Sequence, residues 1–184
     1  MEILGICGSL RKKSLNGLLL KSAADVITAE GSTLTVFDLS DIPFYNADLD
    51  GETKPGPVAG FIRAIDQADG LLFATPEYNY SIPGVLKNAI DWASRPGYQS
   101  ILKGKPAGIL SASISPIGGA RGQIHLRDVL SATLTPMYQA PDCLLPLAQH
   151  AFDDNGVLKD QQVSDRLNRY VKGYLAWVTD MAAG

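Results

Sequence analysis

Residues 70–84 read GLLFATPEYNYSIPG and join a strand-like segment to a helix-like one. The first five residues form a short apolar run of the kind found in a buried strand, and a pattern of helical period follows residue 84. Residues 75–83 are therefore predicted to form a polar, aromatic loop at the carboxyl end of a strand. Because ligands bind at that edge of an open α/β sheet, this stretch indicates both a fold class and a site.

A second loop of the same kind follows the first predicted strand, where residues 8–16 read GSLRKKSLN. A glycine-containing turn at the start of a helix presents free amides to an anion, and the helix dipole adds a favourable field. Ser9, Ser14 and Asn16 can supply neutral hydrogen bonds, and Arg11 can add a charge-assisted one. The loop has neither the Walker sequence nor the three-glycine dinucleotide fingerprint, so it favours a monophosphate over ATP or a Rossmann-bound NAD.

Residues 75–84 combine stiffness with groups that suit an aromatic ring. Two prolines restrict the backbone, Glu77 and Asn79 can form hydrogen bonds, and Tyr78 and Tyr80 can flank a ring. A flavin needs polar groups along its pyrimidine edge, a wall beside its dimethylbenzene edge and one open face. This loop could meet the first two requirements.

Both loops also have ordinary structural interpretations. Ser14 or Asn16 could simply cap a helix whose basic residues are solvated, and residues 75–84 could be a proline-rich turn with surface tyrosines. The position of both loops after predicted strands favours a site instead. Together they could hold the two ends of one flat, phosphorylated cofactor.

Apolar runs alternate along the chain with longer segments of helical period, which indicates βαβ units and a doubly wound α/β fold. We expect one domain over residues 1–184. The predicted strands lie near 2–7, 33–37, 69–74, 107–112 and 136–140, and the predicted helices near 15–30, 56–68, 83–94, 120–132 and 160–181.

Composition excludes several classes of function. The chain has 184 residues, is 46% hydrophobic and carries a formal net charge of -3, with charges of both signs throughout, so we expect no nucleic-acid partner. It begins without a secretion signal and has no apolar stretch of membrane-spanning length, so no membrane partner is expected. Cys7 and Cys143 are far apart in the sequence and suggest no disulfide framework, which favours the cytoplasm. His125 and His150 are isolated, so no metal site is predicted.

A third loop follows the fourth predicted strand, where residues 111–121 read SASISPIGGAR. It should reach the same edge of the sheet, and Gly118 and Gly119 allow close backbone approach. The three loops together resemble the NADPH-dependent FMN reductase family, in its chromate and quinone reductase branch. The resemblance extends over roughly residues 1–132. The family's phosphate motif appears as Gly8, Ser9, Leu10, Arg11, Ser14 and Asn16, and its flavin-ring motif appears at 75–81. Further similarity lies at 83–92 and 118–121.

This resemblance implies a flavodoxin-like fold, with a five-stranded parallel sheet in the order 2-1-3-4-5 and helices on both faces. It implies that FMN is held by Ser9, Arg11, Ser14, Leu15, Asn16, Pro76, Glu77, Tyr78, Asn79, Ser111, Ser113, Gly118 and Gly119. The helix at 83–92 implies a homodimer or homotetramer, in which Tyr80 and Arg121 could meet across a subunit boundary.

The resemblance further implies that NADH or NADPH reduces the bound FMN, which then passes electrons to a quinone, azo compound, chromate or free flavin. No catalytic side chain is obligatory, because the cofactor carries the chemistry. The alternative is a flavodoxin-like electron carrier that does not oxidise a nicotinamide. Such carriers are usually much more acidic than this chain, and their phosphate loop has no cation, whereas this loop contains Arg11. A hydrolase is disfavoured because no Gly-x-Ser-x-Gly turn occurs.

Overall fold

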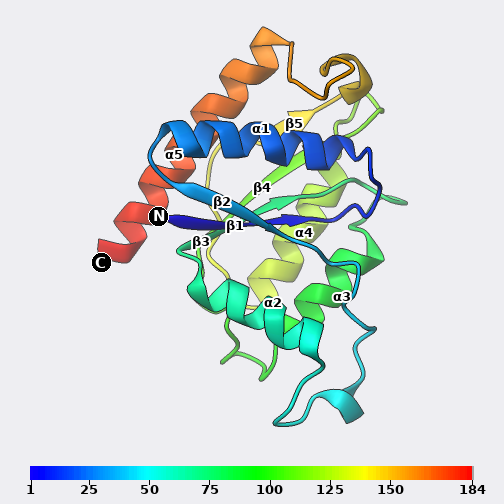
Figure 1. Cartoon of the computed structure of the whole chain (residues 1–184), viewed down its shortest axis with the longest axis vertical. Helices are drawn as coiled ribbons and strands as arrows, with labels where there is room; N and C mark the ends of the chain where they lie inside the picture. The colour runs from blue at the N-terminus through cyan, green and yellow to red at the C-terminus, as the bar shows by residue number, and fades with distance from the viewer. Residues whose placement is uncertain (184) are drawn as a thin grey trace.

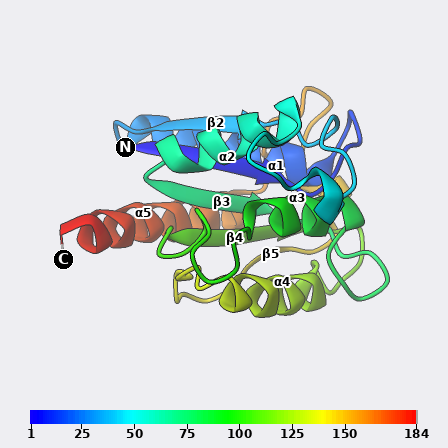
Figure 2. The same cartoon turned by 90° about the horizontal axis from the view of Figure 1, so that it is seen from below.

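The computed structural model describes residues 1–183, which contain one five-stranded parallel sheet. Its strands pair in the order β2-β1-β3-β4-β5, as predicted. Their bounds are β1 (Glu2–Cys7), β2 (Thr33–Phe37), β3 (Gly70–Ala74), β4 (Ala107–Ala112) and β5 (Cys143–Leu145). Figure 2 shows the strands one above another in this order, with their carboxyl ends at the right.

Helices cover both faces of the sheet, as Figure 1 shows. One apolar core joins the sheet to α1 (Leu15–Ala29) and α5 (Gln161–Ala183), and the other joins it to α2 (Gly56–Gln67), α3 (Gly84–Ala93) and α4 (Ala120–Ala132). Two short 3-10 turns, η1 (Ala47–Leu49) and η2 (Ala148–His150), lie in connections between strands and helices. The five predicted helices and the first four predicted strands are confirmed to within two residues.

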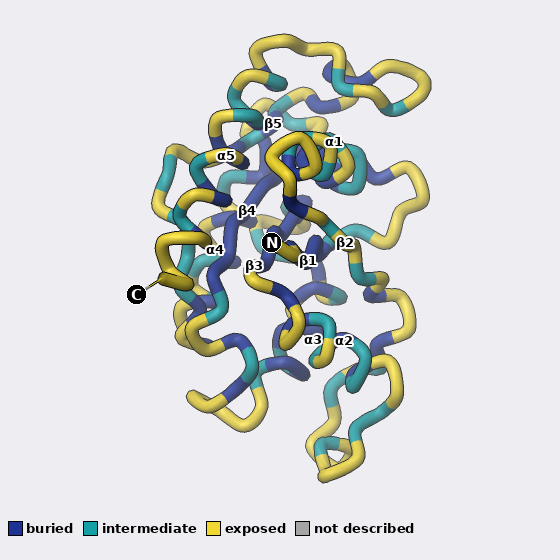
Figure 3. Tube along the Cα trace, turned by 60° about the vertical axis from the view of Figure 1, so that its left-hand side comes forward, coloured by how far each residue is buried: buried dark blue, intermediate teal, exposed yellow. Residues whose placement is uncertain are grey.

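Strands β3 and β4 are buried along their whole length, whereas the edge strand β2 is largely exposed. Figure 3 shows this contrast between the buried centre and the exposed outer loops. Tyr174 of α5 donates a hydrogen bond from Oη to Leu71 O at 2.8 Å, and Tyr170 Oη accepts one from Ile109 N at 2.8 Å. Burial raises the pKa of both phenols, so they remain neutral donors and acceptors that hold α5 against the sheet.

The predicted strand at 136–140 is wrong, because the fifth strand is Cys143–Leu145. Residues 136–138 make only an isolated bridge from Met137 to Ala107, at the beginning of β4. Pro136 and Pro141 have no N–H to donate to a strand ladder, so regular pairing does not continue there. The chain resumes pairing at Cys143, opposite Leu110.

Among residues 1–183, no helix combines the length and apolar character needed to cross a membrane. The same residues contain no group of three or more His, Cys, Asp or Glu side chains that could hold a metal ion.

Candidate functional site

The loops after β1, β3 and β4 meet at the carboxyl edge of the sheet, at the right of Figure 2. Gly8 donates a backbone hydrogen bond to Ala74 O at 2.9 Å. A Cβ added to Gly8 would lie 3.2 Å from Thr75 Oγ1 and 3.4 Å from Pro76 Cδ. The glycine therefore lets the first two loops lie in direct contact, as one site requires.

The loop after β1 presents cations beside the amino terminus of α1. Ser14 is the N-cap and accepts a hydrogen bond from Gly17 N at 3.2 Å, while Arg11, Lys12 and Lys13 are exposed. The first turn of α1 contains no acidic residue, so the positive end of its dipole is not neutralised from within the helix. An anion is the ligand that this arrangement favours.

Asn16 has a structural role that the sequence did not indicate. Its side chain is buried, its Nδ2 donates to Ala112 O at 2.9 Å, and its Oδ1 accepts from Ala112 N at 2.9 Å. These two bonds fasten the first turn of α1 to the end of β4. The amide side chain is thus engaged by the protein, and what Asn16 and the half-buried Leu15 can offer an anion is their backbone N–H groups.

The loop after β3 ends in a tight turn whose aromatic side chains are exposed. Tyr78 and Ser81 exchange backbone hydrogen bonds of 2.9 and 3.0 Å, and the two residues between them have φ values of 50° at Asn79 and 67° at Tyr80. Positive φ at both central positions is the geometry of a two-residue hairpin turn. Pro76 is buried at the base of this loop, so the turn projects from a fixed support.

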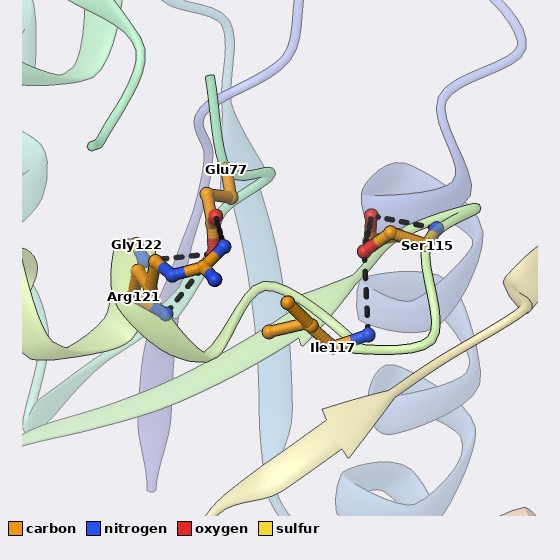
Figure 4. A network of polar contacts seen from close by, with 6 residues as sticks. Glu77, Ser115, Ile117, Arg121 and Gly122 are labelled. Atoms are coloured by element: carbon orange, nitrogen blue, oxygen red, sulfur yellow. Dashed lines mark hydrogen bonds and ion pairs between the residues drawn. The ribbon is translucent and has the colours of Figure 1, made fainter. Parts of the chain in front are cut away.

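The beginning of α4 holds this loop in place, as Figure 4 shows. The N-cap of α4 is Gly119, which has no side chain to accept a hydrogen bond from the first turn. Glu77 supplies that acceptor, because its Oε2 accepts from Arg121 N at 3.0 Å and from Gly122 N at 3.3 Å. The Arg121 guanidinium pairs with Glu77 Oε1 at 3.2 Å and lies 4.3 Å from the ring centroid of Tyr80.

These contacts bear on three residues that the sequence analysis singled out. The carboxylate of Glu77 is engaged by α4, so it orients the loop and is not free along a ring edge. Tyr80 and Arg121 meet within one chain, and a further contact of these residues across a subunit boundary stays a prediction.

The loop after β4 is shaped by a buried hydrogen-bond network. Ser111 Oγ donates to Gly118 O at 2.7 Å and accepts from Gln123 Nε2 at 2.9 Å. Gly118 and Gly119 have φ values of 68° and 88°, and a Cβ on Gly119 would lie 2.9 Å from Ser111 Cβ. Both glycines are therefore required by the packing of the protein itself. Ser113, on the same loop, pairs through its Oγ with Ser115 Oγ at 3.1 Å.

Gln123 was not among the predicted site residues, although it is fully buried and joins three parts of the chain. Its Nε2 also donates to Cys143 O at 3.2 Å, which links the loop to β5. A signal was present in the sequence, because position 123 shares the apolar face of α4 with Leu126 and Leu130. A polar residue within an apolar stripe indicates a buried hydrogen-bond partner.

The three loops leave apolar side chains in contact with solvent beside the cationic loop. Exposed apolar side chains on loops at the carboxyl edge of a parallel sheet are candidates for contact with a ligand. These side chains are Leu10, Tyr78, Tyr80, Ile114 and Ile117. An anion-binding end next to an open apolar and aromatic surface fits a phosphorylated ring compound such as FMN.

Burial raises the pKa of the adjacent Cys7 thiol, so this group is protonated at neutral pH and is not a nucleophile.

Comparisons with known proteins agree with this geometry. Residues 1–150 match the model of the family described as NADPH-dependent FMN reductase. The chain is 43% identical over 178 residues to an NAD(P)H-dependent FMN reductase of Pseudomonas aeruginosa, covering 97% of this chain and 95% of that one. It is 37% identical over 180 residues to a 2-hydroxy-1,4-benzoquinone reductase of a Burkholderia species, covering 98% and 97%.

A solved structure of a flavoenzyme is also similar to this chain over nearly its whole length. The flavoenzyme NAD(P)H:(acceptor) oxidoreductase of Paracoccus denitrificans superposes with a TM-score of 0.90 at 33% identity, covering 98% of each chain. The similarity therefore extends well beyond residue 132, where the motifs recognisable in the sequence end.

Proposed function

Because the chain belongs to the NADPH-dependent FMN reductase family, we propose that it takes electrons from NADH or NADPH and passes them through bound FMN to quinones and similar acceptors. A relative of similar length is named as a benzoquinone reductase, which supports the quinone class of acceptor. Azo compounds, chromate and free flavin belong to the same proposal, because an exposed reduced flavin can deliver electrons to many oxidants.

The observation that carries this proposal is the contact between the cationic loop and the aromatic loop. Arg11 and Ser9 hold the phosphate, assisted by the Ser14 hydroxyl and by the backbone amides of Leu15 and Asn16. The positive end of α1 strengthens each of these contacts, because the phosphate is doubly charged near neutral pH.

The ring lies at the other two loops. Pro76, Glu77, Tyr78 and Asn79 hold one edge through their backbone, since the Glu77 carboxylate is engaged by α4. Ser111, Ser113, Gly118 and Gly119 shape the neighbouring wall. The exposed side of Tyr78 and Tyr80 leaves one face of the ring open to a nicotinamide or a quinone in turn.

When bound, FMN supplies the capacity to accept a hydride and to release electrons to a second substrate. The protein residues bind the two ends of the cofactor, orient its ring and leave one face accessible. No side chain is required to transfer a proton.

An anaerobic visible spectrum tests this proposal. The purified protein is loaded with FMN, and spectra are taken before and after addition of NADPH or NADH. Rapid bleaching of the flavin is expected, followed by reoxidation when a benzoquinone is added. Bound flavin that stays oxidised would favour a flavodoxin-like electron carrier, and absence of FMN binding would overturn the site.

The oligomeric state and location are part of the same proposal. We propose a homodimer or homotetramer formed through α3 and α4, supported by the exposed Ile124 on α4. Light scattering of the purified protein measures its mass, and an Ile124→Glu variant should lower that mass. The free thiols of Cys7 and Cys143 favour a reducing compartment such as the cytoplasm.

A further inference from the structure

Gln123, on α4, is a fully buried amide whose Oε1 has no hydrogen-bond partner among residues 1–183. Its Nε2 donates to Ser111 Oγ at 2.9 Å and to Cys143 O at 3.2 Å. A buried carbonyl oxygen without a partner costs free energy, and an apolar side chain would avoid that cost. The next buried residues on this face of α4 are leucines. Stability alone therefore does not account for an amide at position 123.

The contact with Ser111 transmits the orientation of this amide to the loop after β4. A serine hydroxyl has one hydrogen to donate, and Ser111 donates it to Gly118 O at 2.7 Å. Gln123 Nε2 donates to the same hydroxyl oxygen, so the hydroxyl hydrogen stays directed at Gly118. The Gly118 carbonyl is thereby held toward the buried Ser111.

The peptide group between Gly118 and Gly119 converts this contact into an oriented donor. The peptide is trans, so its C=O and N–H bonds point in opposite directions and the Gly119 N–H points away from Ser111. Gly119 is buried, yet among residues 1–183 no atom accepts a hydrogen bond from its N–H. Buried backbone donors are nearly always paired, so this N–H indicates a ligand on that side of the loop.

Gly119 also lies beside the loop proposed to hold the flavin ring. A Cβ on Gly119 would be 3.8 Å from Thr75 O, where that loop begins. Two-electron reduction of a flavin places negative charge on its pyrimidine ring, and a hydrogen-bond donor near that ring stabilises the charge. A donor that is already fixed needs no reorganisation when the charge appears, so its orientation matters more for reduced FMN than for oxidised FMN.

We infer that Gln123 is a positioning residue that acts through Ser111 and the Gly118 carbonyl. It directs the Gly119 N–H at the negative edge of the cofactor ring and so raises the reduction potential of bound FMN. The inference rests on the proposed function, because it requires FMN to lie against the loop after β4. Gln123 itself is fully buried and affects the cofactor only through that loop.

The test measures the Kd of oxidised FMN by fluorescence titration and the midpoint potential of bound FMN by anaerobic equilibration with a reference dye. Gln123→Met keeps the length of the side chain and removes its hydrogen bonds, and Gln123→Leu is a second apolar variant. Ser111→Ala removes one hydroxyl and adds no atom. Thr135→Val is the matched control, because Thr135 lies just beyond the other end of α4, is buried and donates from Oγ1 to Leu102 O at 3.2 Å.

We expect Gln123→Met and Gln123→Leu to weaken the binding of reduced FMN about tenfold more than that of oxidised FMN. For a two-electron couple, a tenfold change in this ratio lowers the midpoint potential by about 30 mV. Ser111→Ala should lower the potential at least as much. The variant that combines Gln123→Met with Ser111→Ala should lower it no further than Ser111→Ala alone, because Gln123 acts through Ser111. Thr135→Val should leave the potential unchanged.

Two results would overturn the inference. If the potential in the Gln123 variants is unchanged or raised relative to wild type and Thr135→Val, the network has only a structural role. If the shifts of Gln123→Met and Ser111→Ala add in the combined variant, Gln123 does not act through Ser111. Either result with normal FMN binding and bleaching in the wild type leaves the proposed function intact, whereas failure of the wild type to bind FMN would overturn that function separately.

Discussion

Glu77 caps a helix that begins more than forty residues later, because its Oε2 accepts a hydrogen bond of 3.0 Å from the backbone N–H of Arg121. The same carboxylate accepts from Gly122 N and pairs with the Arg121 guanidinium. The loop proposed to hold the flavin ring is thereby attached to the beginning of α4. A change at Glu77 should consequently affect both the stability of the protein and the binding of its cofactor.

We expect Glu77→Ala to lower the free energy of unfolding by about 1 kcal/mol, the usual effect of losing a helix cap. The ion pair adds little, since the Arg121 side chain is 44% exposed. Urea unfolding measures the change, and the Kd of FMN should rise as the loop loses its support. Asp91→Ala removes an exposed ion pair with Lys87 and serves as the control. Equal effects of the two variants would contradict a capping role.

Arg11→Ala should weaken FMN binding about tenfold to a hundredfold, because a hydrogen bond to a charged group contributes about 1.5–3 kcal/mol. Fluorescence titration with FMN measures this loss. Lys13→Ala removes the same charge from an exposed position of the same loop and should have a smaller effect. Arg11→Ala should also weaken the binding of FMN more than the binding of riboflavin, because riboflavin lacks the phosphate. An unchanged Kd for FMN would exclude Arg11 as a phosphate ligand.

Asn16→Ala should destabilise the protein by about 2–4 kcal/mol, because it leaves the buried N–H and C=O groups of Ala112 without their partner. Urea unfolding provides the measurement. Asn168→Ala is a matched control, since Asn168 is only partly buried and bonds within its own helix to Ser164. Losses of similar size in the two variants would show that the contact between α1 and β4 is not important.

Gly119→Ala should be more destabilising than Gly104→Ala, although both glycines have positive φ. The added Cβ at Gly119 would lie 2.9 Å from Ser111 Cβ, whereas the corresponding position at Gly104 is open space. Backbone strain of about 1–3 kcal/mol is common to both variants, and the steric clash affects Gly119→Ala alone. Thermal or urea unfolding measures the stability of both variants, and the difference between them gives the cost of the steric clash. Equal losses of stability in the two variants would show that the clash does not occur.

The stability of the protein should fall as the pH rises above about 9. Burial raises the pKa of the Cys143 thiol from 9.0 to about 11. The unfolded chain therefore loses this proton first, and stability declines between the two pKa values. Relative to pH 7, Cys143→Ala should show about 1 kcal/mol less decline than wild type at pH 10, measured by urea unfolding. Parallel curves for the two proteins would contradict this assignment.

Local patterns in the sequence were sufficient for most of the architecture. The apolar runs located β1 to β4, the helical period located all five helices, and the strand order followed from the resemblance of the loops to a known family. The family itself is confirmed by the match over residues 1–150. That residues 1–184 form a single domain, and that the proposed residues bind FMN, stay predictions.

The roles of individual polar side chains could not be predicted in this way. Asn16 stays a predicted phosphate contact, but the sequence did not show that its side chain fastens α1 to Ala112, 96 residues away. Glu77 stays a predicted contact of the ring, but the sequence did not show that its carboxylate caps α4. The fifth strand was placed too early, because an apolar segment with prolines does not reveal where pairing with β4 resumes.

The sequence by itself determined the periodicity of the elements and the chemistry available in each loop, because apolar spacing, glycine and proline act on the backbone locally. Only the tertiary structure decided which polar groups remain available to a ligand. Asn16 and Glu77 are engaged by Ala112 and by the beginning of α4, whereas Arg11 is exposed. The physical reason is that a hydrogen bond depends on two atoms meeting in space, and partners distant in sequence meet only when the sheet and its helices have packed.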